Sequence, residues 1–296
     1  MTSFPPVPTT GDPALDRVLS DAKQSYAISP DGTRLHTVTV GTGPLVILIH
    51  GFPDFWFSWR RQMVALAKAG FTACAFDLRG FNLSDAPGDD QAYAEASLVE
   101  DVRAVIKASG HTSATVVGHD WGGFVAWRTA FAMPETVQRL VTLNMPHPDL
   151  LARSYARNPA QQAAGAYARK FQSLPPGAPL PIEALTQWVT DSAAKAAYID
   201  ALSRSNPKGM LAYYRVNYPR EPYADPADSD LRTVKVPTLM IYGLKDAYLL
   251  PAAIDGAWKL VEAPFQLVTF PAAAHFVQHD EPDAVTNMLV GWLWSC

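Results

Sequence analysis

Short hydrophobic runs alternate with amphipathic helical stretches along most of this chain. The runs that suit buried strands are residues 45–49, 72–76, 115–117, 140–143, 238–242 and 267–270. Most of them are continuously apolar, which is typical of strands that helices cover on both faces. Helical patterns occupy residues 59–69, 97–109 and 124–131. This alternation predicts an α/β fold with a mostly parallel sheet and flanking helices.

The beginning and the middle of the chain depart from this alternation. Two β-prone runs, residues 25–29 and 34–40, are separated by a Pro-Asp-Gly-Thr turn, which predicts an antiparallel hairpin at the start of the sheet. Residues 146–230 are rich in proline, show helical patterning and contain no convincing strand run. We therefore expect a core of residues 1–145 and 231–296, with residues 146–230 inserted as a helical lid. Ligands of such sheets bind beyond the carboxyl ends of the strands, so the lid would roof the pocket.

Composition limits the expected partners and compartment. The 296 residues carry 24 basic and 28 acidic side chains and no block of lysine or arginine, so we expect no nucleic acid partner. The two cysteines, Cys74 and Cys296, provide neither a disulfide framework nor metal-ligand spacing, and we expect a site without metal. Residues 1–6 lack the features of a signal peptide, and no apolar run approaches the roughly 20 residues that span a bilayer. We expect a cytoplasmic protein without a membrane span.

The segment Gly118-His119-Asp120-Trp121-Gly122 follows a hydrophobic strand and precedes a helical stretch. It has the glycine spacing of a nucleophile elbow, in which a sharp strand-to-helix turn brings neighbouring backbone too close for side chains. Aspartate occupies the nucleophile position. A serine there would form an acyl-enzyme from an ester, whereas an aspartate displaces a leaving group from an sp³ carbon and becomes an alkyl ester. Water then attacks the carbonyl carbon of that ester.

Two backbone amides are candidates for an oxyanion hole. An elbow of this kind uses the amide of the residue after the nucleophile, here Trp121, together with an amide from an early loop. The strand at residues 45–49 runs directly into a His-Gly-Phe-Pro segment, and we assign the second donor to Phe52. Taken alone, this segment is equally compatible with an ordinary strand-ending turn.

His275 is the best candidate for the general base, because it lies late in the chain, just after the last predicted strand. Asp246 follows the preceding strand and is expected to orient His275 and stabilise its imidazolium, which gives the order nucleophile, acid, histidine. An alternative place for the acid holds Asn144, which favours Asp246. Asp77 and Asp54 are the other candidates, although Asp77 is expected to brace a local loop. Three further histidines have surface-like sequence contexts: His36, His111 and His279.

At several separate places the sequence resembles epoxide hydrolases of the α/β-hydrolase superfamily, and the resemblance covers nearly the whole chain. The segments that carry it are residues 50–60 (HGFPDFWFSWR), 77–85 (DLRGFNLSD), 118–123 (GHDWGG) and 275–278 (HFVQ). It implies an α/β-hydrolase fold with a helical cap and a reaction without a cofactor. It also implies that the aspartate opens a small apolar epoxide and that the His–Asp pair drives hydrolysis of the hydroxyalkyl ester. We expect a monomer or a homodimer.

Ring opening is expected to need an acid, because an epoxide oxygen leaves as an alkoxide; such assistance is worth about 10² to 10⁴ in rate. The resemblance implies a pair of cap tyrosines for this task. Tyr167 and Tyr214 occupy matching positions, and Tyr213 is the local alternative to Tyr214. A phenol with a pKa of about 10 stays protonated at pH 7 and still yields its proton to an alkoxide. A cap tyrosine is more often a packing residue, however. Aromatic residues expected in the substrate pocket, or equally in the core, include Trp121, Phe55 and Phe276.

Other functions of the same fold are alternatives. Haloalkane dehalogenases share the aspartate and the tryptophan after it, but halide release needs a second N–H donor. Phe52 has no side-chain N–H, which leaves Trp188 as the only tryptophan of the lid. Trp121 in place of arginine argues against a fluoroacetate dehalogenase, and Asp120 in place of serine argues against a carboxylesterase or lipase. A non-catalytic receptor or scaffold would lose catalytic side chains that this chain retains.

Overall fold

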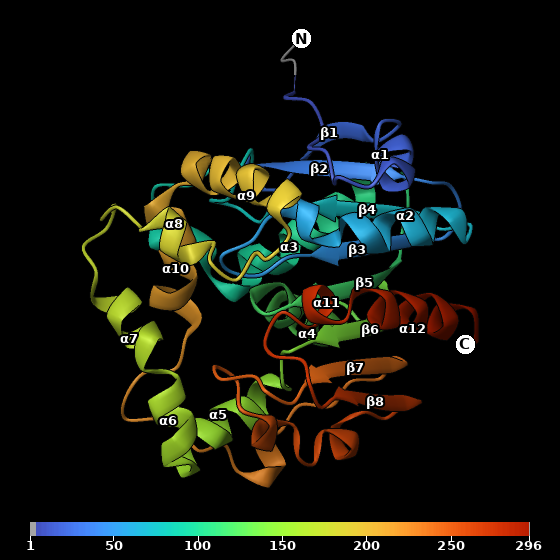
Figure 1. Cartoon of the computed structure of the whole chain (residues 1–296). Helices are drawn as coiled ribbons and strands as arrows, with labels where there is room; N and C mark the ends of the chain where they lie inside the picture. Colours follow the sequence, from blue (N-terminus) through green and yellow to red (C-terminus); the bar gives the residue numbers. More distant parts are fainter. Residues whose placement is uncertain (1–3, 296) are drawn as a thin grey trace.

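An eight-stranded sheet forms the centre of the structure, a computed structural model that describes residues 4–295. Residues 1–3 and Cys296 lie outside the described residues. The strand order is β1-β2-β4-β3-β5-β6-β7-β8 (Figure 1). The bounds are β1 Lys23–Ile28, β2 Arg34–Val40, β3 Leu45–Ile49, β4 Thr72–Phe76, β5 Ala114–His119, β6 Val137–Leu143, β7 Thr238–Gly243 and β8 Phe265–Phe270. β2 pairs antiparallel with β1 and β4, and the other neighbours pair in parallel, so the predicted fold class is confirmed.

Helices cover both faces of this sheet. In Figure 1, α3 and α4 lie behind the sheet and α2 and α12 lie in front of it, and each side buries its own hydrophobic cluster. β3 and β5 are buried along their whole length, and β3 accordingly carries an apolar side chain at every position. The core helices are α1 Pro13–Leu19, α2 Arg60–Lys68, α3 Glu95–Ala108, α4 Trp121–Ala132, α11 Val277–Asp280 and α12 Pro282–Ser295. Short 3₁₀ helices are η1 Trp56–Trp59, η2 Asp90–Tyr93, η4 Pro251–Ile254 and η5 Ala257–Leu260.

Helices, with no strand among the described residues, connect β6 to β7. They are α5 Pro148–Arg157, α6 Pro159–Ala164, α7 Ala166–Ser173, α8 Ile182–Leu185, α9 Ser192–Arg204, α10 Pro207–Asn217 and η3 Asp228–Asp230. They lie together at one end of the sheet, on the left of Figure 1. Prolines open α5, α6 and α10, where the missing N–H has no helical partner to lose, so the prolines that argue against strands mark helix starts. Within residues 4–295, no helix is both long enough and apolar enough for a membrane span.

The turn between β5 and α4 leaves no room for side chains at its glycines. A Cβ on Gly118 would lie 2.1 Å from the carbonyl oxygen of Gly122, and a Cβ on Gly122 would lie 2.1 Å from the carbonyl oxygen of Ile49 in β3. Asp120, at the tip of the turn, has a φ of +52°, which is rare for a residue with a side chain. Close packing between β3, β5 and α4 therefore holds the backbone of Asp120 in a strained conformation.

We expect Gly122→Ala to destabilise the protein by about 3–5 kcal/mol or to prevent folding, because its methyl group would collide with the backbone of a central strand. Gly291→Ala is the matched control. Gly291 lies inside α12 with no atom within 4 Å of an added Cβ, so alanine should stabilise the protein by about 0.5–1 kcal/mol. Urea unfolding followed by circular dichroism measures both effects. Equal stability of the two variants would contradict the crowding at the elbow.

Candidate active site

Asp120, His275 and Asp246 meet at the carboxyl ends of the parallel strands. Asp120 follows β5, Asp246 follows β7, and His275 lies in the loop after β8. His275 Nε2 is 3.3 Å from Asp120 Oδ2, and His275 Nδ1 is 2.8 Å from Asp246 Oδ2. The imidazole therefore lies between two carboxylates, and all three side chains are nearly or fully buried. The three residues chosen from the sequence as nucleophile, base and acid are in direct contact.

Neutral hydrogen-bond donors hold the Asp246 carboxylate in place. The Asn144 side-chain amide donates to Asp246 Oδ2 over 2.8 Å, and the backbone amides of Tyr248 and Leu249 donate to Oδ1 over 2.8 and 3.0 Å. Asn144 also accepts a hydrogen bond from the amide of Gly243. The alternative acid position at the end of β6 therefore carries a donor that orients the carboxylate at the end of β7.

The second carboxylate oxygen of Asp120, Oδ1, contacts the loop that follows β3. The backbone amide of Phe52 donates to Asp120 Oδ1 over 2.8 Å. Gly51 makes this approach possible, because a Cβ at that position would lie 2.4 Å from the Cβ of Asp120. The amide of Trp121 follows Asp120 directly in the chain, but among the described residues no hydrogen bond joins it to the carboxylate. Of the two amides assigned to the oxyanion hole, the one from Phe52 thus already contacts Asp120.

The charges of this cluster shift one another's pKa values. Burial lowers the pKa of His275, but the charge of Asp246 and the contacts with both carboxylates outweigh it and raise the pKa to about 10. Burial raises the pKa of Asp120, yet its hydrogen bond to His275 and the charge of that imidazole hold the pKa below its ordinary value. Burial also raises the pKa of Asp246, but the charge of His275 and its hydrogen bond hold that pKa below its ordinary value. At neutral pH the cluster is therefore an imidazolium between two carboxylates.

The alternative acids lie elsewhere. Asp77 accepts hydrogen bonds from the amide of Trp56 and the side chain of Asn82, and it pairs with His36 over 2.7 Å, so it braces the loop after β4. His36 is fully buried, and the expectation of a surface position for it is wrong. Both ring nitrogens of His36 are hydrogen-bonded, one to Asp77 and the other to Gln24, and the neighbouring sequence does not predict these contacts. Burial raises the pKa of Asp54 to about 7, and this side chain bonds its neighbouring loop rather than His275.

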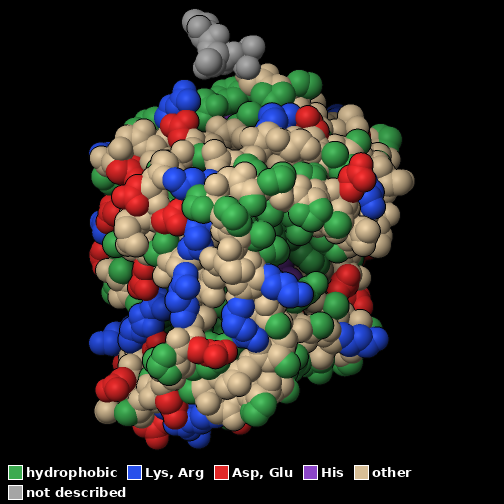
Figure 2. All heavy atoms as spheres, turned by 90° about the vertical axis from the view of Figure 1, so that its left-hand side faces the viewer, with side chains coloured by type: hydrophobic (Ala, Val, Ile, Leu, Met, Phe, Trp, Pro, Cys, Tyr) green, Lys and Arg blue, Asp and Glu red, His purple; other side chains and the backbone are tan. Residues whose placement is uncertain are grey.

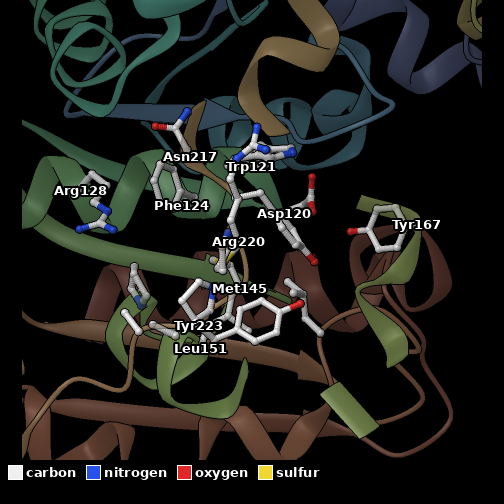
Figure 3. A pocket seen from close by; sticks show the side chains of 17 residues that line it. Asp120, Trp121, Phe124, Arg128, Met145, Leu151, Tyr167, Asn217, Arg220 and Tyr223 are labelled. Carbon is white, nitrogen blue, oxygen red and sulfur yellow. The ribbon is translucent and has the colours of Figure 1, made fainter. Parts of the chain in front are cut away.

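Two cavities meet at Asp120. The α4 cavity has a volume of about 300 Å³, and its walls include Asp120, Trp121, Phe124, Arg128, Tyr167 and Tyr218 (Figure 3). The Phe276 cavity has a volume of about 330 Å³, and its walls include Phe52, Asp120, Tyr167, Tyr214, His275 and Phe276. Figure 2 shows a hollow with hydrophobic side chains on the side of the inserted helices. The walls are mainly apolar around a few polar groups, as expected for a small-molecule site.

Phe55 lines neither of these cavities, so of the two positions left open for it, pocket and core, the structure places it in the core. Its ring is buried among Trp56, Phe57 and Tyr198, with the Tyr198 ring 5.0 Å away. The 3₁₀ turn after the early loop directs this side chain into the core beneath α9. Trp121 and Phe276 line the α4 cavity and the Phe276 cavity, respectively.

Tyr167 and Tyr214 come from α7 and α10 and converge above Asp120. Their ring centroids are 6.0 Å apart in an edge-on arrangement, and both side chains line the Phe276 cavity with Asp120. Burial and then nearby charged or ionisable groups, including Asp120, raise the pKa of each phenol well above its ordinary value, so both stay protonated as donors. Tyr213 points elsewhere, because its hydroxyl donates to the carbonyl of Arg79.

Several residues around this site were not predicted from the sequence. Tyr218, which directly follows the last residue of α10, lines the α4 cavity, and its hydroxyl forms a short hydrogen bond with Tyr155. Tyr214 and Tyr218 are four residues apart, and this spacing could have predicted that their rings lie side by side. Tyr248, two residues after Asp246, packs edge-on against His275 with centroids 5.2 Å apart. Among residues 4–295, no three histidine, cysteine, aspartate or glutamate side chains are grouped to hold a metal ion.

Comparisons with known proteins point in one direction. A family model described as the α/β-hydrolase fold matches residues 44–282. Epoxide hydrolase 4 of Homo sapiens is 31% identical over 284 residues, covering 88% of this chain and 76% of that protein. A Bacillus megaterium epoxide hydrolase in complex with an inhibitor matches with a TM-score of 0.79 and 31% identity, covering 91% of this chain and 99% of that one. A mutant epoxide hydrolase from the same organism, complexed with its product (R)-3-[1]naphthyloxy-propane-1,2-diol, matches with the same TM-score, identity and coverage.

The ion pairs of His275 should make stability depend on alkaline pH. The folded-state pKa of His275, about 10, lies above the ordinary value of 6.5, so their stabilisation is complete below pH 6.5 and is lost as the pH rises through about 10. The advantage of the wild type over His275→Gln in free energy of unfolding should therefore shrink between pH 7 and pH 10. Urea unfolding across this range measures it, with His111→Gln as the control. A difference that stays constant with pH would exclude a protonated His275 in the folded state.

Proposed function

Since this chain belongs to the α/β-hydrolase family and, within it, to the epoxide hydrolases, we propose that Asp120 converts epoxides to vicinal diols through a covalent ester. The observation that carries this proposal is the contact of Asp120 with His275, and of His275 with Asp246, beneath two tyrosines. A carboxylate nucleophile, a base with its orienting acid and two protonated phenols are the groups that the reaction needs.

In the first step, one oxygen of Asp120 attacks a carbon of the epoxide ring. Oδ2 is the attacking atom in this proposal, because Oδ1 accepts the Phe52 amide and is held as the future ester carbonyl. The bond from Oδ2 to carbon forms while the carbon–oxygen bond of the ring breaks. Tyr167 and Tyr214 hydrogen-bond to the departing oxygen, and one of them gives it a proton. The products of this step are a hydroxyalkyl ester and a phenolate.

Ester formation also prepares the base. The two carboxylates raise the pKa of His275 in the free enzyme, and the ester removes the charge of one of them. The pKa of His275 then falls, and its proton restores the phenol of the tyrosine. Neutral His275, held by Asp246, next takes a proton from water as that water attacks the ester carbonyl. The amides of Phe52 and Trp121 stabilise the oxyanion. Collapse of this intermediate breaks the bond to the diol oxygen, which takes the proton of the newly formed carboxyl group and leaves Asp120 as a carboxylate.

We also assign residues 146–230 as the cap domain of this enzyme. Helices α7 and α10 of this segment provide Tyr167 and Tyr214, whereas the core provides Asp120, Asp246 and His275. The reaction thus takes place at the boundary between the cap and the core. The mainly apolar cavities suit an apolar substituent on the epoxide, as in the aromatic product bound to the Bacillus megaterium protein.

One observation favours a second candidate, halide displacement. Trp188 lines the Phe276 cavity, stacks on Phe276 at 3.7 Å between centroids, and has a buried indole N–H without an acceptor among the described residues. This N–H is the second donor that a haloalkane dehalogenase would need. A paired assay separates the candidates by following diol from an aryl epoxide and halide from a 1-haloalkane. Formation of diol alone supports epoxide hydrolysis. Release of halide alone would overturn that function in favour of halide displacement.

Removing the base should trap the covalent intermediate. We expect His275→Ala to form the ester but to hydrolyse it slowly, so that intact-mass spectrometry shows the protein heavier by the mass of one epoxide. Asp120→Ala should show neither turnover nor an added mass. His111→Ala is the control and should turn over substrate without accumulating the ester. Turnover by Asp120→Ala, or product formation by His275→Ala with no trapped ester under rapid quenching, would contradict the division of roles.

The two tyrosines should share the acid role. Tyr167→Phe and Tyr214→Phe are each expected to slow ester formation by about 10-fold to 10²-fold, and the double variant by about 10³-fold or more. Single-turnover measurements isolate this step. Tyr213→Phe is the matched control on the same helix, because its hydroxyl is bound to the Arg79 carbonyl, and it should react within a few-fold of the wild type. Wild-type rates in the double variant would remove both residues from the mechanism.

A further inference from the structure

A chain of hydrogen-bonding side chains lies behind Tyr167 in the inserted helices. Its members are the hydroxyls of Tyr218 and Tyr155 and the side-chain amide of Gln161. Tyr155 and Gln161 are fully buried, and the Tyr155 hydroxyl is hydrogen-bonded to that of Tyr218. The amide nitrogen of Gln161 donates to the Tyr155 hydroxyl over 3.3 Å. The mechanism proposed above uses Tyr167 and gives no role to the three side chains behind it.

Two backbone groups fix the orientation of the Gln161 amide. The backbone amide of Leu250 donates to Gln161 Oε1 over 2.9 Å, and Gln161 Nε2 donates to the backbone carbonyl of Tyr248 over 2.8 Å. A flipped side chain would place its NH₂ group against an N–H and its oxygen against a carbonyl, so only the observed orientation satisfies both neighbours. Toward Tyr155, the Gln161 side chain is therefore a donor.

The direction of the whole chain follows from this donor. Because the Tyr155 oxygen accepts from Gln161, the Tyr155 proton is left for the oxygen of Tyr218. The proton of Tyr218 is then available to a third group. That group is Tyr167, whose ring lies edge-on to that of Tyr218 with centroids 6.4 Å apart and whose hydroxyl is hydrogen-bonded to it. In Figure 3 the hydroxyl of Tyr167 points toward Asp120.

The acidities of these phenols agree with this direction. Burial and nearby ionisable groups raise the pKa of Tyr167 well above its ordinary value, whereas the hydrogen bond with Tyr218 lowers it. Burial, followed by the neighbouring phenols of Tyr167 and Tyr155, raises the pKa of Tyr218, which therefore stays a donor at neutral pH. Hydrogen bonds in such a chain polarise one another, so each link behind Tyr167 adds to the stabilisation of its phenolate.

We propose that Tyr218, Tyr155 and Gln161 are positioning residues that strengthen Tyr167 as the acid of ring opening. This inference rests on the function proposed above. As the carbon–oxygen bond of the epoxide breaks, the proton of Tyr167 moves to the departing oxygen, and the electron pair of its O–H bond stays on the phenolate. The Tyr218 hydroxyl donates a hydrogen bond to that phenolate and keeps its own proton.

The first test removes one hydroxyl at a time. We expect Tyr218→Phe to slow ester formation about tenfold, because it removes the donor to the phenolate. Tyr155→Phe should slow it about threefold, because Tyr218 keeps its proton and loses only the polarisation. Single-turnover measurements give this rate, and hydrolysis of the ester should change less than about threefold in both variants. Tyr213→Phe is the control, because its hydroxyl binds the Arg79 carbonyl outside the chain.

A pair of substrates separates proton donation from a loss of packing. Attack at the terminal carbon of 1,2-epoxypropane or of its 3,3,3-trifluoro analogue leaves the oxygen on the substituted carbon. The trifluoromethyl group stabilises the departing oxygen as an anion, so ring opening of the analogue needs less help from an acid. The slowing by Tyr218→Phe should therefore fall from about tenfold to about threefold or less with the analogue. A packing defect would slow both substrates equally.

Gln161→Glu tests the direction of the chain with almost no change of shape. A carboxylate cannot donate, and a protonated carboxyl group would give its single proton to the carbonyl of Tyr248. In either state, Tyr155 has to turn its own proton toward the new carboxyl group. The Tyr218 proton then goes to Tyr155, and Tyr167 loses its donor. We expect ester formation to slow about tenfold, as in Tyr218→Phe.

A double variant shows whether Gln161 acts through Tyr218. Gln161 also binds the loop that holds Asp246, so its substitution can disturb more than the chain. In the Tyr218→Phe background, Gln161→Glu should slow ester formation by less than about twofold, because the group through which it acts is already absent. Gln162→Glu is the matched control: its amide binds the backbone carbonyl of Tyr155 rather than the hydroxyl, and it should react within a few-fold of the wild type.

The outcomes separate this inference from the proposed function. Wild-type rates of ester formation in Tyr218→Phe and Gln161→Glu would overturn the chain and leave epoxide hydrolysis intact. Equal slowing with both epoxides, or additive effects of the two substitutions, would indicate a structural role and would also overturn it. No diol from any epoxide with the wild type would overturn the proposed function itself. A slowing by Tyr218→Phe that shrinks with the trifluoro analogue, and no further loss from Gln161→Glu, would establish the chain.

Discussion

The imidazolium of His275 between two buried carboxylates is the interaction on which the site depends. Each of the three charged groups is costly to bury alone, and removing one partner from such a group typically costs about 3–5 kcal/mol because it leaves an uncompensated charge. The cluster is stable only when all three side chains arrive together. The parallel sheet meets this requirement, because β5, β7 and the loop after β8 end at the same edge. Backbone amides and Asn144 supply the remaining hydrogen bonds with neutral donors.

The position of Asn144 illustrates how charge is limited in this cluster. It occupies the end of β6, between the strands that carry Asp120 and Asp246. A second carboxylate there would repel Asp246 across the 2.8 Å that separates the Asn144 amide from Oδ2. The amide instead stabilises that carboxylate and leaves its charge to act on His275. In the proposed cycle, His275 becomes a base only when Asp120 loses its charge to the ester, so the number of carboxylates around the imidazole controls the order of the steps.

Much of this architecture was predictable, because it depends on strong local signals. Continuous hydrophobic runs mark the buried strands, and the glycines at 118 and 122 mark a turn that side chains cannot enter. The three charged residues follow from their positions after predicted strands. Predictions failed or were incomplete where the answer depends on contacts between distant segments. Phe55 turns into the core beneath α9, and His36 is buried by its pairing with Asp77, which lies 41 residues later. The neighbouring sequence does not predict which way the side chain of Phe55 or of His36 points.

The proposed division of labour between cap and core follows from their different constraints. The nucleophile must be rigid, and the crowded elbow fixes Asp120 by backbone contacts that tolerate no variation. The tyrosines come from cap helices, where burial keeps their phenols protonated above the carboxylate.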